Sequence, residues 1–344
     1  MDSDHAVSLW VETLRGGLVE SVSRVRAVAL GPGQDGPETV LYQSGNPAEP
    51  IFWRSAAKFI QALSLVESGA ADKFGLTDSE LALACASHSG SDAHVEGVRR
   101  MLEKIGARPE DLHCAPHVPL GPPEAKQLAA RGPGSASEPT RLHNNCSGKH
   151  TGMLAVCRVR GWPFADYNRL HHPLQQEILR HLSEVSDVPM EQIGTAVDGC
   201  GAVVFRTPLP AMARAYRRLL AGALPAPHQA AGQRLLQAMR VAPQMVAGIG
   251  RLCTRLIEVS GGRLVPKIGA DGVYGLGMDK GSGYGLALKI EDGSGRIVEA
   301  VLCHLAAHLG WLSPEQLETL RPHWDLPIYN HQREQVGDVR VRFT

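Results

Sequence analysis

Two residues at the start of a helical stretch, Ser55 and Lys58, have the types and the spacing that nucleophilic catalysis needs. They lie three residues apart in "FWRSAAKFIQAL", residues 52–63. A serine hydroxyl is a weak nucleophile unless a base lies within hydrogen-bond distance, and a lysine one helical turn later faces the same way. Aromatic neighbours or the cation Arg54 would lower the pKa of that lysine. By itself the pattern is more often an ordinary helix cap and a solvated lysine.

A second serine and a second lysine extend this pattern. Ser87 lies in "ASHSG", at the predicted end of a helix, and Lys267 lies in "PKIGADG", where C-terminal strands are predicted to begin. Serine enzymes with a Ser-x-x-Lys pair combine it with a further serine and a strand lysine that move protons. Each residue taken singly is more often structural, a polar helix end or an exposed strand lysine. Their occurrence together favours catalysis.

Cysteines in two segments predict a metal site. Cys146 and Lys149 lie one helical turn apart in "HNNCSGKHTG", and Cys200 lies in the tight-turn sequence "VDGCGAV". Two thiolates favour zinc. The alternative is that both cysteines are small buried residues.

The remaining ligands of that site stay open at this point. A lysine ligand must lose its proton, so His143, His150 or Asp198 could replace or accompany Lys149. The Gly-Lys pair does not belong to a phosphate-binding loop, because His143 stands where that loop needs glycine and His150 where it needs serine or threonine.

The composition is that of a globular protein that acts on a small molecule. The 344 residues carry 35 basic and 35 acidic side chains, with no run of like charge that would bind nucleic acid or a membrane surface. The first residues lack a secretion signal, and no stretch is long enough to span a bilayer, so we expect a cytoplasmic protein. The odd number of cysteines, 7, argues against a disulfide framework.

The periodicity predicts strands at both ends of the chain and helices between them. We expect strands within about 7–50 and 263–292 and a mostly helical region over about 55–260. The first helix should run from Ser55 to near Gly69, a long irregular loop should cover 118–142, and one helix should span 243–259. We therefore predict a single α+β domain, 1–344, whose terminal strands form one antiparallel sheet with an inserted helical layer.

Several segments together resemble the bacterial L-asparaginase II family of the Rhizobium etli type. The resemblance rests on "VETLRGGLVESV", "WRSAAKFIQALSLVESGAADKFGLTDSELALACASHSG", "HNNCSGKHTGML", "GWP", "VDGCG" and "KIGADGV", between residue 11 and about 273. It implies a serine β-lactamase/glutaminase-like fold, a homodimer, and hydrolysis of L-asparagine to L-aspartate and ammonia.

The resemblance also implies roles for particular residues. Ser55 is the favoured nucleophile with Lys58 as its base, and Ser87 with Lys267 forms the second, proton-transferring pair. The family's zinc site, accessory to substrate binding, falls on Cys146, Lys149 and Cys200, with Asp198 beside it. Arg54 is a candidate for the substrate carboxylate, since a guanidinium can bind it through two hydrogen bonds. We assign His88 and Asp271 to substrate binding as well.

Two other functions fit the same residues. A β-lactamase-like or other serine hydrolase of amides or peptides could use both serine-lysine pairs. A non-catalytic zinc-binding or thiol-sensing protein would use the cysteines alone.

Overall fold

The computed structural model describes residues 8–33, 38–132, 134 and 137–344. The chain forms two compact units, each assembled from separated segments. The first unit comprises 1–56, 206–221 and 255–344, and the second comprises 57–205 and 222–254. Antiparallel sheet predominates in the first and helices in the second, so the predicted α+β class is confirmed.

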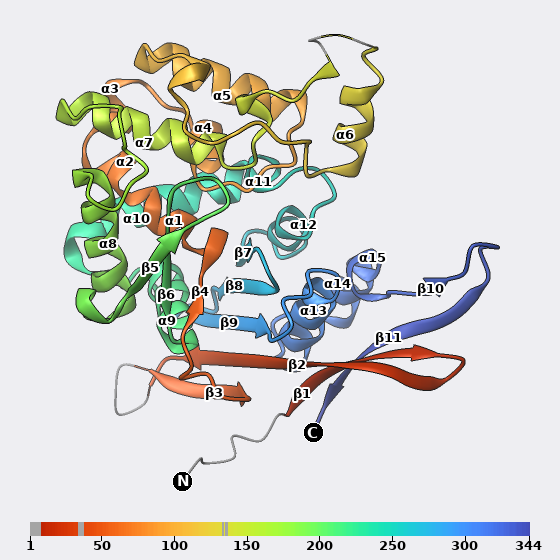
Figure 1. Cartoon of the computed structure of the whole chain (residues 1–344). Coiled ribbons are helices and arrows are strands. Elements are labelled where there is room, and N and C mark those ends of the chain that lie inside the picture. Colours follow the sequence, from red (N-terminus) through yellow and green to blue (C-terminus); the bar gives the residue numbers. More distant parts are fainter. Residues whose placement is uncertain (1–7, 34–37, 133, 135–136) are drawn as a thin grey trace. The chain divides into compact units, whose positions relative to one another are not determined.

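An eight-stranded antiparallel sheet forms the centre of the first unit (Figure 1). Seven strands follow the order β10-β11-β1-β2-β9-β8-β7, and β3 pairs with β2 beside this path. Their bounds are β1 Leu9–Arg15, β2 Leu18–Gly31, β3 Thr39–Ser44, β7 Leu264–Gly269, β8 Val273–Met278, β9 Tyr284–Ile290, β10 Ile328–Tyr329 and β11 Gln335–Phe343. The N-terminal strands do pair with the C-terminal ones, as predicted, along β2 and β9. Residue 7, where the strands were predicted to begin, lies outside the described residues.

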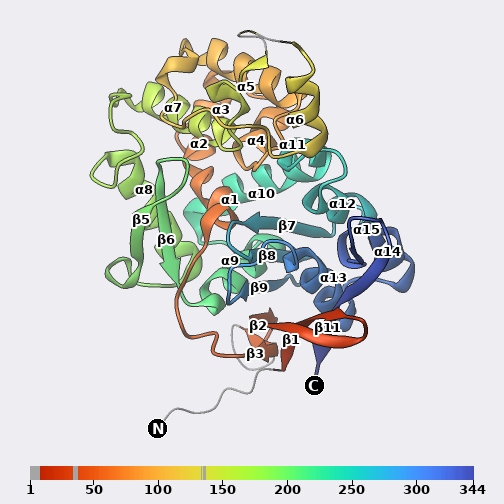
Figure 2. The same ribbon diagram turned by 45° about the vertical axis from the view of Figure 1, so that its right-hand side comes forward.

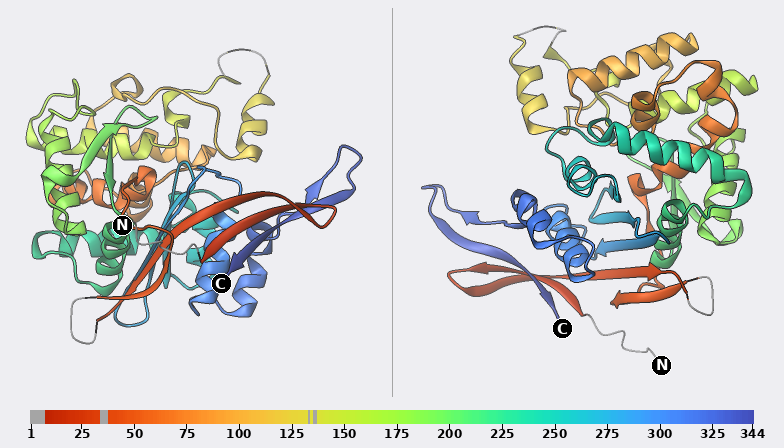
Figure 3. Two further views of the ribbon diagram at one scale, coloured as in Figure 1. Left: turned by 60° about the horizontal axis from the view of Figure 1, so that its bottom comes forward. Right: turned by 180° about the vertical axis from the view of Figure 1, so that it is seen from behind.

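The sheet continues further along the chain than predicted. Strand β11 runs antiparallel to β1, from Leu9 opposite Phe343 to Arg15 opposite Gly337, as the views in Figure 3 show. The sequence prediction ended the sheet near residue 292. It missed β11 because the partner strand lies more than 300 residues earlier, and no local pattern encodes such a pairing.

Helices cover the sheet where glycines allow close approach. Helix α9, Leu209–Ala221, packs on β2, β8 and β9. A Cβ atom added to Gly285 would lie 1.9 Å from the Ala213 carbonyl oxygen, and one at Gly275 would lie 2.2 Å from the Tyr216 ring. Helix α13, Val298–His308, contacts β8, β9 and β11, together with the short α14, Pro314–Thr319, and α15, Arg321–Trp324. The glycine-rich C-terminal sequence is thus explained by helix packing.

The second unit is a cluster of helices around α4 (Figure 2). Helix α4, Asp78–Ala84, contacts α5, α7, α10 and α11. It begins at Thr77, which forms a capping box with Glu80. The other helices are α1 Lys58–Gln61, α2 Leu63–Glu67, α3 Ala70–Lys73, α5 Asp92–Ile105, α6 Pro122–Ala129, α7 Ser147–Arg160, α8 Pro173–Ser186, α10 Ala226–Val241 and α11 Pro243–Val246.

A glycine brings α7 against the end of α4. A Cβ atom on Gly148 would lie 2.3 Å from the Leu83 carbonyl oxygen, so only glycine fits there. This close packing holds the "CSGKHTG" segment beside the loop that leaves α4 and carries Ser87.

Three local predictions were wrong. The helix expected from Ser55 to Gly69 is divided into the 3-10 turn η1, Arg54–Ala57, then α1 and α2. The helix expected over 243–259 breaks into α11 and α12, Leu252–Val259, because Gly248 and Gly250 adopt positive φ values of 131° and 76°. The loop expected over 118–142 contains α6, which begins with two prolines at its first positions.

Three short strands lie outside the main sheet. Strand β5, Gly194–Val197, and β6, Val203–Thr207, fall in the region predicted to be mostly helical. Strand β4, Ile51–Phe52, pairs with the end of β6. The turn between β5 and β6 is the "DGCG" segment that was predicted to be tight.

Candidate functional site

Hydrogen bonds of the first unit hold the turn that carries Ser55. The buried Trp53 indole donates to Thr207 Oγ1 over 2.7 Å, and the Tyr216 hydroxyl donates to the Ala56 carbonyl over 2.9 Å. Ser55 lies between these anchors in η1 and is half-buried. Its backbone is therefore fixed while part of its side chain stays accessible to a small molecule.

Arg54 and Asp271, both predicted to bind substrate, lie together in the first unit. Their side chains form an ion pair, and Lys289 donates to the Asp271 carbonyl over 2.6 Å. Arg54 and Asp271 have positive φ values of 50° and 55°. Such backbone costs roughly 1–3 kcal/mol for residues other than glycine and is concentrated at functional sites.

The two residues border a pocket of about 210 Å³ with a strongly basic wall. The lining residues are Arg26, Pro50, Ile51, Phe52, Arg54, Arg206, Ala270, Asp271, Val273 and Lys289. Four of these residues are cationic and one is anionic, so the pocket suits a small carboxylate that would compete with Asp271 for Arg54.

Lys267 lies on β7 of the same unit. Its side chain is buried, its strand position pairs with Gly275, and its ammonium donates to the Ile268 carbonyl over 3.0 Å. The simpler expectation of an exposed strand lysine is therefore wrong. Ser55, Arg54, Lys267 and Asp271 thus all belong to the first unit.

In the second unit the structure brings Lys58 and Ser87 together. Lys58 is the first residue of α1 and is 1% exposed, and Ser87 follows α4 and is 4% exposed. The Lys58 ammonium donates to the Ser87 hydroxyl over 3.0 Å, to the Ala86 carbonyl, and to the Asn145 carbonyl over 3.4 Å. Of the acceptors described for this buried lysine, only the serine hydroxyl can pass a proton on.

His88, next to Ser87, is a fully buried histidine with one unpartnered nitrogen. The Ser147 hydroxyl donates to the Leu142 carbonyl over 2.9 Å, so His88 Nε2 donates to Ser147 Oγ, also over 2.9 Å. Within the described residues, His88 Nδ1 has no hydrogen-bond partner. Burial, and then the neighbouring His94 and Lys58, hold the pKa of His88 well below its usual value. The ring is therefore neutral and presents an acceptor nitrogen.

The cysteines predicted to bind metal also lie together in the second unit. Cys146 precedes α7, Cys200 lies in the β5–β6 turn, and the Lys149 ammonium donates to Cys200 Sγ over 3.2 Å. A hydrogen bond to Cys200, together with burial, raises the pKa of Cys146 to about 12. The same hydrogen bond, with Lys149 and against burial, lowers the pKa of Cys200 to about 5. Of the two thiols, Cys200 is therefore the one that loses its proton more readily.

Asp198 completes the predicted metal group from the start of the same turn. Its backbone carbonyl accepts from Gly201 N over 2.8 Å and its carboxylate accepts from Gly199 N over 2.8 Å. Burial alone would lower the pKa of Lys149, but Cys200, Cys146 and Asp198 outweigh it and raise that pKa. The two sulfur atoms fit zinc, since soft sulfur ligands are the ones zinc prefers, whereas Lys149 would have to lose its proton before its amine could join them.

The sequence prediction missed a second group of metal-ligand types. Among the described residues, one set of three His, Cys, Asp or Glu side chains is close enough to hold an ion: Glu67, His181 and His228. They come from α2, α8 and α10. No sequence motif indicates these residues, because the spacings between them are long and they lie in three different helices.

Comparison with known proteins identifies the family. The family model described as L-asparaginase II matches residues 11–341. This chain belongs to the L-asparaginase II family. No match was found among the curated proteins.

Membership of the L-asparaginase II family implies L-asparaginase activity, an amidohydrolase reaction with asparagine as its substrate. The resemblance noted in the sequence is thereby confirmed, and it extends nearly to the C-terminus. Within the described residues, every helix is too short or too polar to cross a membrane.

Proposed function

We propose that this chain hydrolyses L-asparagine to L-aspartate and ammonia through a serine acyl-enzyme. The observation that carries the proposal is the buried contact of 3.0 Å between Lys58 Nζ and Ser87 Oγ. A charged lysine cannot accept a proton, and the hydroxyl of Ser87 offers a route by which the proton leaves it.

Ser55 is the proposed nucleophile in this reaction, three residues before Lys58 on a continuous run of chain. Its Oγ attacks the side-chain amide carbon of asparagine while neutral Lys58 takes the hydroxyl proton. The tetrahedral intermediate collapses, the C–N bond breaks, and the proton goes to the departing ammonia. Water then attacks the β-aspartyl ester, giving L-aspartate and free Ser55. Ser87 and Lys267 form the second pair, which carries the initial proton away from Lys58 and so keeps that lysine neutral.

The basic pocket supports the assignment of the substrate carboxylate. Arg54, which pairs with Asp271, would exchange that partner for the α-carboxylate of asparagine. Asp271 would then be released to accept from the substrate's α-ammonium group. His88 Nδ1, a buried acceptor, would take an N–H of the substrate.

Cys146, Lys149 and Cys200, with Asp198 nearby, would hold a zinc ion. When bound, the ion supplies a fixed positive charge that strengthens substrate binding. The lowered pKa of Cys200 supports this role, since zinc takes deprotonated sulfur.

A homodimer and a cytoplasmic location complete the proposal. All seven cysteines have free thiols, which supports a reducing compartment. Analytical ultracentrifugation of the purified chain tests the dimer.

Ammonia release from L-asparagine tests the activity, with L-glutamine and a chromogenic β-lactam as comparison substrates. Ser55→Ala and Ser87→Ala should each lower kcat at least about 10³-fold while circular dichroism stays unchanged. Ser186→Ala is the matched control, because Ser186 is also buried in the second unit and its hydroxyl donates to the Leu182 carbonyl of its own helix.

Acid quenching during turnover of L-aspartate β-methyl ester locates the nucleophile. Mass spectrometry should find the aspartyl group on Ser55. An aspartyl group on Ser87 would reverse the roles of the two serines, and a folded wild-type protein without ammonia release would overturn the proposed activity.

A further inference from the structure

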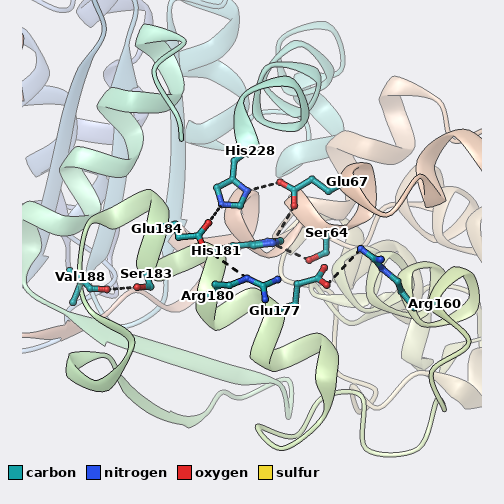
Figure 4. Close-up of polar contacts among 10 residues, drawn as sticks. All are labelled: Ser64, Glu67, Arg160, Glu177, Arg180, His181, Ser183, Glu184, Val188 and His228. Carbon is teal, nitrogen blue, oxygen red and sulfur yellow. Dashed lines mark hydrogen bonds and ion pairs between the residues drawn. The ribbon is translucent and has the colours of Figure 1, made fainter. Parts of the chain in front are cut away.

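Three helices of the second unit direct a carboxylate and two imidazoles to one point (Figure 4). Glu67 is the last residue of α2, His181 lies in α8, and His228 lies in the first turn of α10. The candidate ligand atoms all lie within 4.8 Å of one another. Helix α2 packs against both α8 and α10, so the convergence results from the core packing of the unit.

The group is shielded from solvent. The side chains of His181 and His228 are each 3% exposed, and that of Glu67 is 18% exposed. Burying two imidazoles beside a carboxylate requires that each polar atom finds a partner.

His228 has the orientation of a metal ligand with an outer carboxylate. Its Nε2 lies 2.6 Å from Glu184 Oε2 and its Nδ1 lies 2.7 Å from Glu67 Oε1. Imidazoles that bind metals nearly always donate the other ring N–H to a carboxylate or carbonyl, which fixes the tautomer and the ring plane. Glu184 fills that outer position, and Nδ1 faces the centre of the group.

His181 repeats the arrangement with a hydroxyl outside. Its Nε2 lies 3.2 Å from Glu67 Oε2, and its Nδ1 lies 3.5 Å from Ser64 Oγ. Each imidazole therefore directs one nitrogen to the carboxylate of Glu67 and the other to an outer polar group.

We propose that Glu67, His181 and His228 bind a divalent transition-metal ion such as zinc, at a site separate from the cysteine group. Bonds of about 2.0–2.2 Å in a tetrahedral arrangement place neighbouring ligand atoms roughly 3.3 Å apart. His228 Nδ1 lies 2.7 Å from Glu67 Oε1, His181 Nε2 lies 3.2 Å from Glu67 Oε2, and all candidate ligand atoms lie within 4.8 Å of one another. Side-chain rotation within the group would bring one oxygen and both nitrogens to the spacing that the ion needs.

Charge and donor chemistry agree with this occupant. Two imidazoles and one carboxylate, with a water molecule as fourth ligand, are a common zinc set. The ion would displace the proton on His228 Nδ1, which passes to solvent. Its two positive charges would then be balanced by Glu67 and Glu184. Bound there, the ion would link α2, α8 and α10.

The experiment uses the full chain with Cys146→Ser and Cys200→Ser, which removes the cysteine group, after treatment with a chelator. Cobalt(II) should bind with one equivalent and give weak d–d absorption bands without the thiolate charge-transfer band, and zinc should raise the Tm. In the same background, Glu67→Gln should weaken cobalt binding by at least about 100-fold, and Glu184→Gln by about 10- to 100-fold.

Glu177→Gln is the matched control. Glu177 lies on α8 one turn before His181 but pairs with Arg160, at 3.8 Å, so cobalt affinity should not change. If the double cysteine variant does not fold, the wild-type chain is used instead and should bind two cobalt ions. Glu67→Gln should then remove one equivalent of cobalt and its d–d bands, while the thiolate charge-transfer band of the cysteine group remains.

The proposal is overturned if zinc leaves the Tm unchanged, or if cobalt binds equally to the Glu67→Gln chain. Glu67, His181 and His228 would then form only hydrogen bonds and ion pairs, without a metal ion. This result is independent of the proposed hydrolysis, since no residue of the group takes part in that mechanism.

Discussion

The second unit contains two pairs of buried histidine rings that differ in their polar partners. His88 and His94 stack at 5.0 Å with an interplanar angle of 16°, whereas His181 and His228 lie 4.6 Å apart at 60°. The partners of the first pair are hydroxyls and carbonyls: Ser147 for His88, and Ser91 and Gln244 for His94. The partners of the second pair include carboxylates.

The pKa values of the four rings depend on burial and on these partners together. Burial lowers the pKa of both His88 and His94.

 For His94, the hydrogen bond to the Gln244 carbonyl and the charge of Glu124 oppose burial without offsetting it. Burial lowers the pKa of His228 too, but its hydrogen bonds to Glu67 and Glu184 outweigh burial and raise that pKa. At His181 burial outweighs the charge of Glu67 and lowers the pKa, so hydrogen bonds to two carboxylates set His228 apart from His181.

The two pairs also differ in what lies beside them. His88 follows Ser87, which contacts Lys58, so the neutral pair belongs to the proposed catalytic region. The pair with carboxylates joins three helices. We expect changes near the first pair to affect turnover and changes near the second to affect stability.

Lys58→Met should have the largest effect. It removes the ammonium that contacts Ser87 while keeping the length of the side chain, so kcat for L-asparagine should fall at least about 10³-fold. Lys104→Met is the control, since Lys104 pairs with Glu80 at 2.6 Å in the same unit and should leave kcat within about 3-fold. Equal activity of the Lys58 variant and the wild type would remove Lys58 from the mechanism.

Glu67→Gln should mainly affect stability. Without metal, the loss of a carboxylate that serves both His181 and His228 should lower the free energy of unfolding by about 2–3 kcal/mol. Urea denaturation measures this, and kcat well below the Tm should stay within about 3-fold of wild type. The exposed Glu96→Gln is the control and should change stability by less than about 0.5 kcal/mol. A large loss of kcat in the folded Glu67 variant would contradict the expectation that the His181 and His228 pair affects stability rather than turnover.

The neutral pair should make stability depend on pH. The pKa values of His88 and His94 lie lower in the folded chain than in the unfolded chain, so the unfolded chain binds more protons below about pH 6.5. Their contribution is complete above that pH and is lost as pH falls toward the folded-state values. Replacing His94 by Gln should reduce the slope of unfolding free energy between pH 5 and 7 by up to about 1.4 kcal/mol per pH unit. Urea denaturation of the wild type and of the His94→Gln chain over this pH range measures the two slopes. Equal dependence of the unfolding free energy on pH in both proteins would contradict the lowered pKa of His94.

Glu184→Gln should have the smallest effect on the metal-free protein. The Glu184 side chain is 40% exposed, so solvent screens its ion pair with His228. We expect the free energy of unfolding to fall by no more than about 1 kcal/mol, measured by the same denaturation. A loss as large as that of Glu67→Gln would show that both carboxylates contribute equally.

Local sequence patterns predicted the parts of this protein that local interactions build. The mostly helical region, which includes α7 and α8, and the tight turn at Cys200 follow from residues close in the chain. The long motifs around Ser55, Ser87 and Cys146 were enough to indicate the family, which the match over residues 11–341 confirmed.

Only the tertiary structure decided which distant residues meet. The pairing of β11 with β1, the contact of Lys58 with Ser87, and the convergence of Glu67, His181 and His228 join elements that are remote in sequence. Hydrophobic packing of helices and strands makes these contacts, and it depends on the shape and volume of many side chains at once. Residue types and their spacing therefore indicated the chemistry of asparagine hydrolysis, whereas the buried group of one carboxylate and two imidazoles became visible only when α2, α8 and α10 were packed together.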